Sequence, residues 1–431
     1  MVDLGGMGSI EIRYIATIFF VLAVLHTFAA KFIHSLAKKC KPGSFGEKLF
    51  HFLGEVEIIF GIWSLLFIAV WSLLFGWTSA IAFLQSVDYT EAVFVFAIMC
   101  MSATRPVLDF CRERINGLAS IIPLPFSISL YAVTLTIGPL LGSLITEPAA
   151  MTVTAFLLKE NFFDKPLSLK FKYATLALLF VNVSIGGTLT HFAAPPVLMV
   201  AAPWGWTSIF MLTTFGPRVI PAIMISTLAT AWFFRRELVR VVIPRLDVAH
   251  KTAAFVPFWV IGLQIVFMAA AIAANHHMLW VLALFLGFLG WCLVTKKYQD
   301  QLKIKESFLV AVFLGGLITL GKLQDWWLKP LLSQLGPISI FLGATGLTSV
   351  VDNAAITYLG TLVESLSDEA RYLLVAGAVT GGGLTVIANA PNPAGYSILQ
   401  KSFDEDGINP MPLFLGALPY TVVVAIIFLL F

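Results

Sequence analysis

The chain has 431 residues, of which 59% are apolar and only 12% are charged, and its mean hydropathy is +0.91. A soluble domain is about a quarter charged, and many apolar runs here approach the ~20 residues that span a bilayer. These properties exclude a water-soluble domain, and continuous rather than alternating runs exclude a membrane β-barrel. The net charge of +3 gives no reason to expect a nucleic-acid partner.

The apolar runs predict an all-α polytopic membrane protein built from two similar halves. Residues 1–234 form the first half, and its predicted elements are helices over 13–33, 55–76 and 91–104, a hairpin over about 118–158, a broken helix over about 173–203 and a helix over 219–234. A basic linker over 235–251 follows, and we expect it to lie on the cytoplasmic lipid surface. Residues 252–431 form the second half, with helices over 253–274, 278–294 and 308–320, a hairpin over about 337–363, a broken helix over about 372–399 and a last helix over 411–431.

Each half has an acidic residue inside a long apolar run, at 144–152 and at 350–357. The alignment of the two runs pairs Glu147 with Asp352, Pro148 with Asn353 and Thr152 with Thr357. A carboxylate at membrane depth is costly and usually marks an ion path, although a structural, hydrogen-bonded acid is the plain alternative. Repeated acidic segments of this kind predict a duplicated transporter whose site lies between its halves.

Each acidic run is followed by a Gly-rich interruption, at 186–196 and at 381–393. Glycine and proline unwind helices, and unwound backbone inside a membrane must line a cavity or be packed in protein. A kink alone more often serves packing than binding, but matched kinks after matched acids favour a binding role. The predicted hinge or unwound positions are Gly186, Gly187, Gly381, Gly382, Gly383, Pro195, Pro196, Pro391 and Pro393.

The distribution of basic residues predicts the topology. If both acidic segments are re-entrant hairpins, most of the 27 basic residues fall on one side, as the positive-inside rule requires. The first hairpin then opens from the inside and the second from the outside. This arrangement predicts inverted repeats, with both chain ends outside, in a cell (inner) membrane.

Side-chain and carbonyl oxygens near the hairpin tips suit a hard cation such as Na⁺, by analogy with the oxygen ligands of Ca²⁺ and Mg²⁺. We expect Na⁺ at Asp352 and also at Glu147, and a buried carboxylate can take up a proton when the cation leaves. His191 either relays protons or is a hydrogen-bond partner only. The candidate ion-binding or proton-carrying residues are Asp352, Glu147, Asn353, Thr146, Thr152, Thr357, Thr188, Thr190, His191, Thr385, Asn389 and Asn392.

At the Asp352-Asn353 and Gly-Gly-Leu-Thr motifs the chain resembles the ion transporter superfamily, and within it the NhaD-type sodium–proton antiporters and the arsenite permease group. The resemblance implies a homodimer that works by an elevator-like motion, with ion sites at the hairpin tips and broken helices. Members that carry dicarboxylates have neutral tips, whereas both tips here are acidic. No arginine lies in either tip or interruption, and both features favour a cation as cargo.

The sequence therefore predicts a secondary antiporter that exchanges Na⁺ or Li⁺ for protons by alternating access, without a cofactor. One alternative keeps the fold and carries an anion, arsenite or a dicarboxylate. A more remote alternative is an intramembrane aspartyl protease, in which two acids share a proton. No HExxH zinc motif is present, and we do not expect an enzyme.

Overall fold

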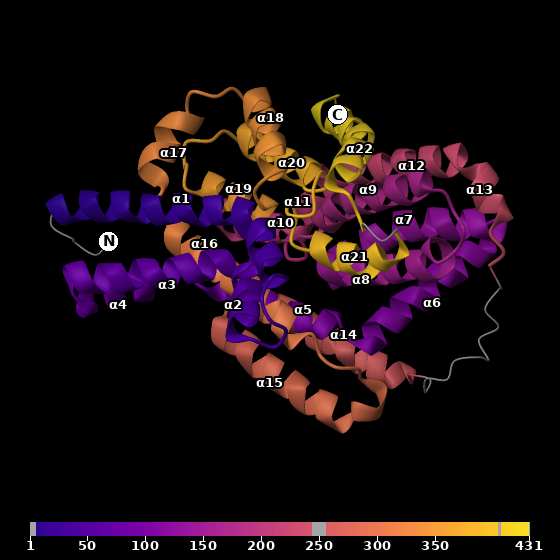
Figure 1. The fold of residues 1–431 in the computed structure, drawn as a ribbon, viewed down its shortest axis with the longest axis horizontal. Helices are drawn as coiled ribbons and strands as arrows, with labels where there is room; N and C mark the ends of the chain where they lie inside the picture. The colour runs from indigo at the N-terminus through magenta and orange to yellow at the C-terminus, as the bar shows by residue number, and fades with distance from the viewer. Residues whose placement is uncertain (1–5, 244–255, 404–406, 431) are drawn as a thin grey trace.

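The computed structural model describes residues 6–243, 256–403 and 407–430, and this part of the chain consists of helices joined by loops, with no strand (Figure 1). Six of the described helices are long and apolar enough to cross a membrane, or eight if each of two sharply bent pairs counts as one span. A helix satisfies its own backbone hydrogen bonds, which is what a lipid environment demands. The predicted all-α polytopic membrane fold is confirmed.

The first half contributes two groups of helices. The first group is α1 (Gly6–Ala37), α2 (Phe45–Leu53), α3 (Val56–Phe75), α4 (Trp77–Ser86), α5 (Thr90–Ser102) and α6 (Arg105–Ile121). The second group is α7 (Phe126–Ile145), α8 (Glu147–Leu158), the π-helical turn η1 (Lys159–Phe163), α9 (Leu169–Gly186), the 3₁₀ turn η2 (Gly187–Leu189), α10 (Pro195–Trp204), α11 (Ser208–Thr214), α12 (Gly216–Phe233) and α13 (Arg235–Arg240).

The second half follows a similar order. Its described elements are α14 (Phe258–Ala273), α15 (Met278–Val294), the 3₁₀ turn η4 (Lys296–Tyr298), α16 (Ile304–Gly321), α17 (Asp325–Leu332), α18 (Pro337–Thr348), α19 (Asn353–Thr361), α20 (Asp368–Gly381), α21 (Asn392–Leu399), the 3₁₀ turn η5 (Gln400–Ser402) and α22 (Pro410–Leu430).

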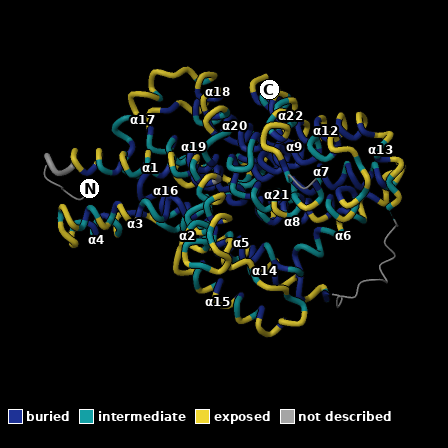
Figure 2. The backbone as a smooth tube through the Cα atoms, in the orientation of Figure 1, coloured by how far each residue is buried: buried dark blue, intermediate teal, exposed yellow. Residues whose placement is uncertain are grey.

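The helices differ in how much protein surrounds them. In Figure 1, α1, α3 and α4 extend to one side, whereas α7, α8, α9, α20 and α21 gather near the middle. Figure 2 shows the buried backbone concentrated in that central group. An 18-residue window of Leu169–Leu189 is 72% buried, against 22% for one of Ile10–Ala30. The centre is therefore a protein-filled interior, where polar groups can be kept from lipid.

Close helix contacts at glycines build this interior. In lipid, helices associate through close van der Waals packing, which small residues permit. A Cβ at Gly186 of α9 would lie 2.5 Å from the Pro139 carbonyl oxygen of α7, and Gly381 of α20 faces the Thr345 carbonyl of α18 in the same way. Gly316 of α16 meets the Phe60 backbone of α3.

The two halves interlock through the helices that leave the acidic segments. Within each half, α7 packs on α9 and α18 packs on α20. Between the halves, α8 packs on α21 and α19 packs on α10. The start of α8 and the start of α19 are thereby brought to the interruptions.

Helices end and begin within both of the predicted interruptions. The structure ends α9 at Gly186 and begins α10 at Pro195, and it ends α20 at Gly381 and begins α21 at Asn392. The sequence analysis missed α2 and α6, whose apolar residues fall on one face rather than in a continuous run. Of the predicted linker helix, Arg235–Arg240 is helical as α13, and residues 244–251 lie outside the described residues.

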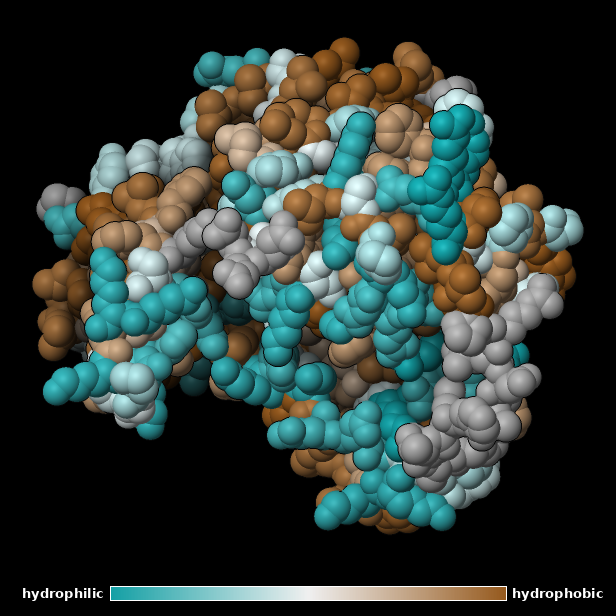
Figure 3. All heavy atoms as spheres, turned by 45° about the vertical axis from the view of Figure 1, so that its right-hand side comes forward, coloured by the Kyte–Doolittle hydropathy of each residue, from teal (hydrophilic) through white to brown (hydrophobic). Residues whose placement is uncertain are grey.

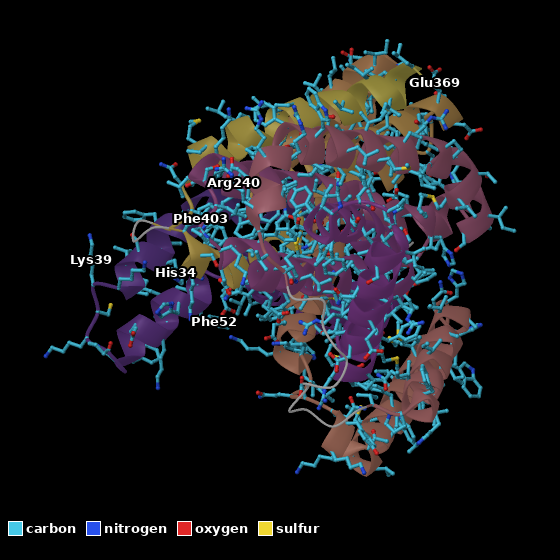
Figure 4. All side chains as sticks on the ribbon, turned by 90° about the vertical axis from the view of Figure 1, so that its right-hand side faces the viewer. His34, Lys39, Phe52, Arg240, Glu369 and Phe403 are labelled. Atoms are coloured by element: carbon cyan, nitrogen blue, oxygen red, sulfur yellow. The ribbon has the colours of Figure 1, made fainter. Side chains whose placement is uncertain are left out.

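Polar residues collect on one face of the molecule. Figure 3 shows hydrophilic side chains collected across one face, between hydrophobic flanks. Figure 4 labels Lys39 and Arg240, both from segments predicted inside, toward one side of the molecule, and Glu369, from a segment predicted outside, toward the other.

Candidate functional site

The starts of α8 and α19 are each fixed to the interruption of their own half by a backbone hydrogen bond. The Glu147 N–H donates to the Ala193 carbonyl over 3.3 Å, and the Asn353 N–H donates to the Ala388 carbonyl over 3.1 Å. We call Thr146-Glu147 the first tip and Asp352-Asn353 the second tip. Each tip therefore lies against unwound backbone.

A second pair of contacts repeats in the same way. Thr190 Oγ1 donates to the Ser143 carbonyl over 2.7 Å, and Thr385 Oγ1 donates to the Ser349 carbonyl over 2.8 Å. From the first half to the second, Ser143 to Ser349 is a step of 206 residues and Thr190 to Thr385 is a step of 195. The 206-residue step also takes Glu147 to Asn353.

These contacts correct the predicted alignment, which was wrong by one residue. Glu147 is the first residue of α8 and corresponds to Asn353, the first residue of α19, whereas Thr146 corresponds to Asp352. The sequence alignment matched acid to acid, but the backbone contacts depend on where each helix begins. The two carboxylates therefore occupy different positions on their tips.

Glu147 is wholly buried and incompletely hydrogen-bonded. Its Oε2 accepts a hydrogen bond from Asn389 Nδ2 over 3.2 Å, while its Oε1 has no hydrogen-bond partner. Gly187 leaves the room for this carboxylate, because a Cβ there would lie 2.6 Å from Oε1. A buried carboxylate is stable only if a cation, a proton or further donors accompany it.

Three buried asparagines supply further unpaired oxygens at the tips and interruptions. Asn353 has neither its Oδ1 nor its Nδ2 bonded, and the Oδ1 atoms of Asn389 and Asn392 also lack partners. Asn392 Nδ2 donates to the carbonyls of Gly382 and Thr385, each over 2.8 Å, and so fixes the second interruption. Buried polar atoms are normally satisfied, so this number of unpaired oxygens points to a ligand or water. We call Glu147, Asn353, Asn389 and Asn392 the tip cluster.

Asp352 is 8% exposed and lies beside the tip cluster. Its Oδ1 accepts a hydrogen bond from the Ala354 N–H over 2.8 Å and caps α19. Asp352 and Asn389 also line a cavity of about 30 Å³, and Glu57 of α3 lies on the same cavity. Because Asn389 contacts Glu147 as well, both acids belong to one buried polar region.

Glu57 was not among the predicted site residues. Acids at the start of a span, such as Glu55 and Glu57, are normally explained by their favourable position at a helix N-terminus. Both do lie at the start of α3, but only Glu55 pairs with Lys305, at 3.1 Å, while Glu57 faces the cavity of Asp352. The sequence signal that could have identified Glu57 is its place as the second residue of an apolar span.

Several predicted site residues make only local contacts. Thr152, Thr188 and Thr357 donate to the carbonyls of Pro148, Ile185 and Ala354, respectively, three or four residues earlier in the chain. These bonds stabilise helix turns and do not reach the carboxylates. Thr146 has a positive φ of 78°, and its Oγ1 lies 3.0 Å from Ser102 Oγ of α5.

His191 lies apart from the tip cluster, in contact with other partners. Its Nδ1 is 2.8 Å from Ser208 Oγ, and its Nε2 is 3.1 Å from Asn275 Nδ2. Together with Glu91 and His276 it lines a separate small cavity. Both ring nitrogens therefore have hydrogen-bond partners.

The predicted hinge residues lie at the interruptions. Pro195 and Pro196 begin α10, Pro391 precedes α21, and Pro393 lies in its first turn. Gly382 lies against Asn353, since a Cβ there would be 2.9 Å from Asn353 Nδ2. Gly383 packs on the backbone of Val181 in α9.

Within the described residues, no three His, Cys, Asp or Glu side chains gather in a group that could hold a metal ion. The tip cluster instead combines one carboxylate with amide oxygens. Oxygen sets of this kind suit hard cations rather than transition metals.

The chain was compared with known proteins. A family model described as "Putative Na+/H+ antiporter" matches residues 11–431, almost the whole chain. No curated protein matches the chain. The chain therefore belongs to this Na⁺/H⁺ antiporter family, whose members are multi-pass membrane transporters of cations and protons.

Proposed function

We propose that this antiporter exchanges Na⁺ or Li⁺ for protons by alternating access, and that the cation binds in the tip cluster. The observation that carries the proposal is Glu147, a fully buried carboxylate with one oxygen unpaired beside unpaired amide oxygens. No cofactor takes part, because the transported ions are the only cargo that the family function requires.

Competition for one carboxylate explains how exchange arises. A bare carboxylate in a dry interior is unfavourable, so Glu147 is accompanied by either a cation or a proton. Each ion then excludes the other, and a transporter that moves only when Glu147 is neutralised exchanges the two. Asp352 takes part as the second acid of the same buried region.

The surroundings of the tip cluster favour a cation over an anion. Arsenite or a dicarboxylate would face the Glu147 carboxylate and the unpaired amide oxygens of Asn389 and Asn392. The Asn353 Nδ2 is an unpaired donor, but a single neutral amide does not offset two neighbouring carboxylates. Family membership favours the same cargo.

We further propose that the halves are inverted repeats which move in an elevator-like manner, that the protein is a homodimer, and that it belongs to the NhaD-like part of the ion transporter superfamily. The repeated contacts of the two tips support a duplication. The separation of Lys39 and Arg240 from Glu369 supports basic loops inside, with both chain ends outside a cell (inner) membrane (Figure 4).

The test uses the full chain in proteoliposomes that contain a pH-sensitive dye. Na⁺, Li⁺ and K⁺ are added in turn, and proton movement is recorded across the pH range. Na⁺ or Li⁺ should drive proton movement, and Asp352→Asn should abolish it while the protein stays folded. Asp325→Asn, at an acid of α17 that pairs with Lys329 at 3.6 Å, is the matched control and should exchange normally. Correctly inserted wild-type protein that moves no protons with any cation would refute the proposal.

A further inference from the structure

A second acidic site lies next to the tip cluster and contains Glu57. Glu57 of α3 and Asp352 of the second tip line one cavity of about 30 Å³, which has room for about one water molecule. Apart from Asn389, the side chains around it are apolar, and Val310 and Phe313 of α16 are among them. Two carboxylates thus share a small space, in which Asp352 also accepts the hydrogen bond from the Ala354 N–H.

The lysines near this pair form ion pairs with other acids. Lys305 forms an ion pair with Glu55 at 3.1 Å, and Lys303 forms one with Glu306 at 3.7 Å. Glu147 adds a further acid on the other side of Asn389. Two carboxylates that line one small cavity repel each other, which favours a state in which one of them is protonated.

Asn389 also points to a protonated group in this cavity. Its Nδ2 donates to Glu147 Oε2, so its Oδ1 is free to accept, and that oxygen is unpaired in a side chain only 1% exposed. A carboxylic acid O–H from the cavity is a suitable donor for it. Asn389 would then connect an acid that holds a proton with an acid that holds a cation.

We infer that Glu57 and Asp352 hold a transported proton between them, in addition to the proton that competes with the cation at Glu147. This proton site is distinct from the tip cluster and joined to it by Asn389. The inference rests on the proposed exchange function and adds a residue and a division of roles to it. The pair takes a proton from water to form one carboxylic acid and one carboxylate, and returns the proton to water when the cation is bound at Glu147.

The position of the cavity indicates the membrane face that supplies the proton. Glu57 lies in the first turn of α3, and α3 and α16 begin side by side, as the Glu55–Lys305 pair shows. The cavity is therefore nearer to the face that carries Lys303 and Lys305. That is the face predicted to be inside.

The experiment compares Glu57→Gln with Glu55→Gln in the full chain. Glu55 is two residues away on the same turn and serves as the matched control, because it pairs with Lys305 outside the cavity. Na⁺-driven proton movement is measured in proteoliposomes from about pH 6 to pH 9, and Na⁺-dependent thermal protection is measured on the same preparations.

Glu57→Gln should keep Na⁺ protection, with its midpoint within about twofold of wild type, because the tip cluster is intact. Its pH of half-maximal exchange should fall by about one unit, since Asp352 without a neighbouring carboxylate holds its proton less firmly. Glu55→Gln should follow the wild-type profile, and Glu57→Asp, which keeps a carboxylate, should move back toward it. Glu57→Leu is a second carboxylate-free variant if Glu57→Gln does not fold.

An unchanged pH profile in a folded carboxylate-free variant would overturn the proton site, and so would loss of Na⁺ protection together with exchange. A purely structural role for Glu57 would lower the rate without moving the pH midpoint. If wild type and Glu55→Gln also fail to exchange, the proposed function itself fails, and this result is separate from failure at Glu57 alone.

Discussion

The two tips have the same backbone contacts but carry their acids one position apart. In the first tip the acid is Glu147, the first residue of α8, which lies against Gly187. In the second tip that position is Asn353, which lies against Gly382, and the acid is the preceding cap residue, Asp352. A shift of one residue therefore changes what the carboxylate contacts: Glu147 lies against the helix interruption, whereas Asp352 faces other helices.

The preceding position faces the helices outside the tips in both halves. Thr146 lies 3.0 Å from Ser102 of α5, and Asp352 shares a cavity with Glu57 of α3. Two tips with the same backbone contacts can therefore place one acid in a buried cluster and the other at its edge. The two acids are thus suited to different ions.

The largest effect on Na⁺ binding is expected for Glu147→Gln. Removing the only carboxylate of the tip cluster should reduce exchange by at least about 100-fold, because the loss of a buried charged partner costs roughly 3–5 kcal/mol. Na⁺ should no longer raise the melting temperature, while the cation-free protein should be no less stable than wild type, since a buried charge is removed. Thermal unfolding with and without Na⁺ measures both effects.

Glu160→Gln is the control for that substitution, because Glu160 pairs with Arg112 at 3.3 Å on the surface. Persistent Na⁺ protection in Glu147→Gln would show that the cation binds elsewhere. The first tip would then not be the cation site.

A smaller effect is expected for Gly187→Ala, which crowds the first tip and leaves the second tip unchanged. The added methyl group would lie 2.6 Å from Glu147 Oε1, and overpacking of this kind costs about 1–3 kcal/mol. The Na⁺ concentration for half-maximal thermal protection should rise about tenfold. Gly382→Ala should raise it less, because it displaces the neutral amide of Asn353 rather than a charged ligand.

Gly416→Ala controls for the substitution itself, since a Cβ there would meet Ala177 at an ordinary 3.5 Å. Equal weakening of Na⁺ protection by Gly187→Ala and Gly382→Ala would mean that the two tips contribute equally to the cation site.

The smallest effects are expected where the tips are alike. Thr190→Val and Thr385→Val each remove one hydrogen bond from an interruption to a tip, worth about 1 kcal/mol. Both should lower the melting temperature by about 2 °C and by similar amounts. Thr152→Val, which loses only a bond within α8, should change it less. A large difference between the first two variants would argue against equivalent tips.

Much of the fold could be predicted from local sequence. Apolar runs identify the spans because backbone in lipid must be helical, and glycine with proline identifies the interruptions at 187–194 and 382–391. The two acids inside apolar runs were also visible, since such residues are rare in membrane spans. Amphipathic α2 and α6 were missed because they have no continuous apolar run.

The sequence by itself determined that this is a helical membrane protein with two acidic, interrupted segments, because burying charge or unwinding backbone in lipid requires particular residue types. Only the tertiary structure decided that Glu147 corresponds to Asn353, that Asn389 contacts Glu147, and that Glu57 faces Asp352. These pairings depend on how helices far apart in the chain pack together, and no local pattern of residues records that packing.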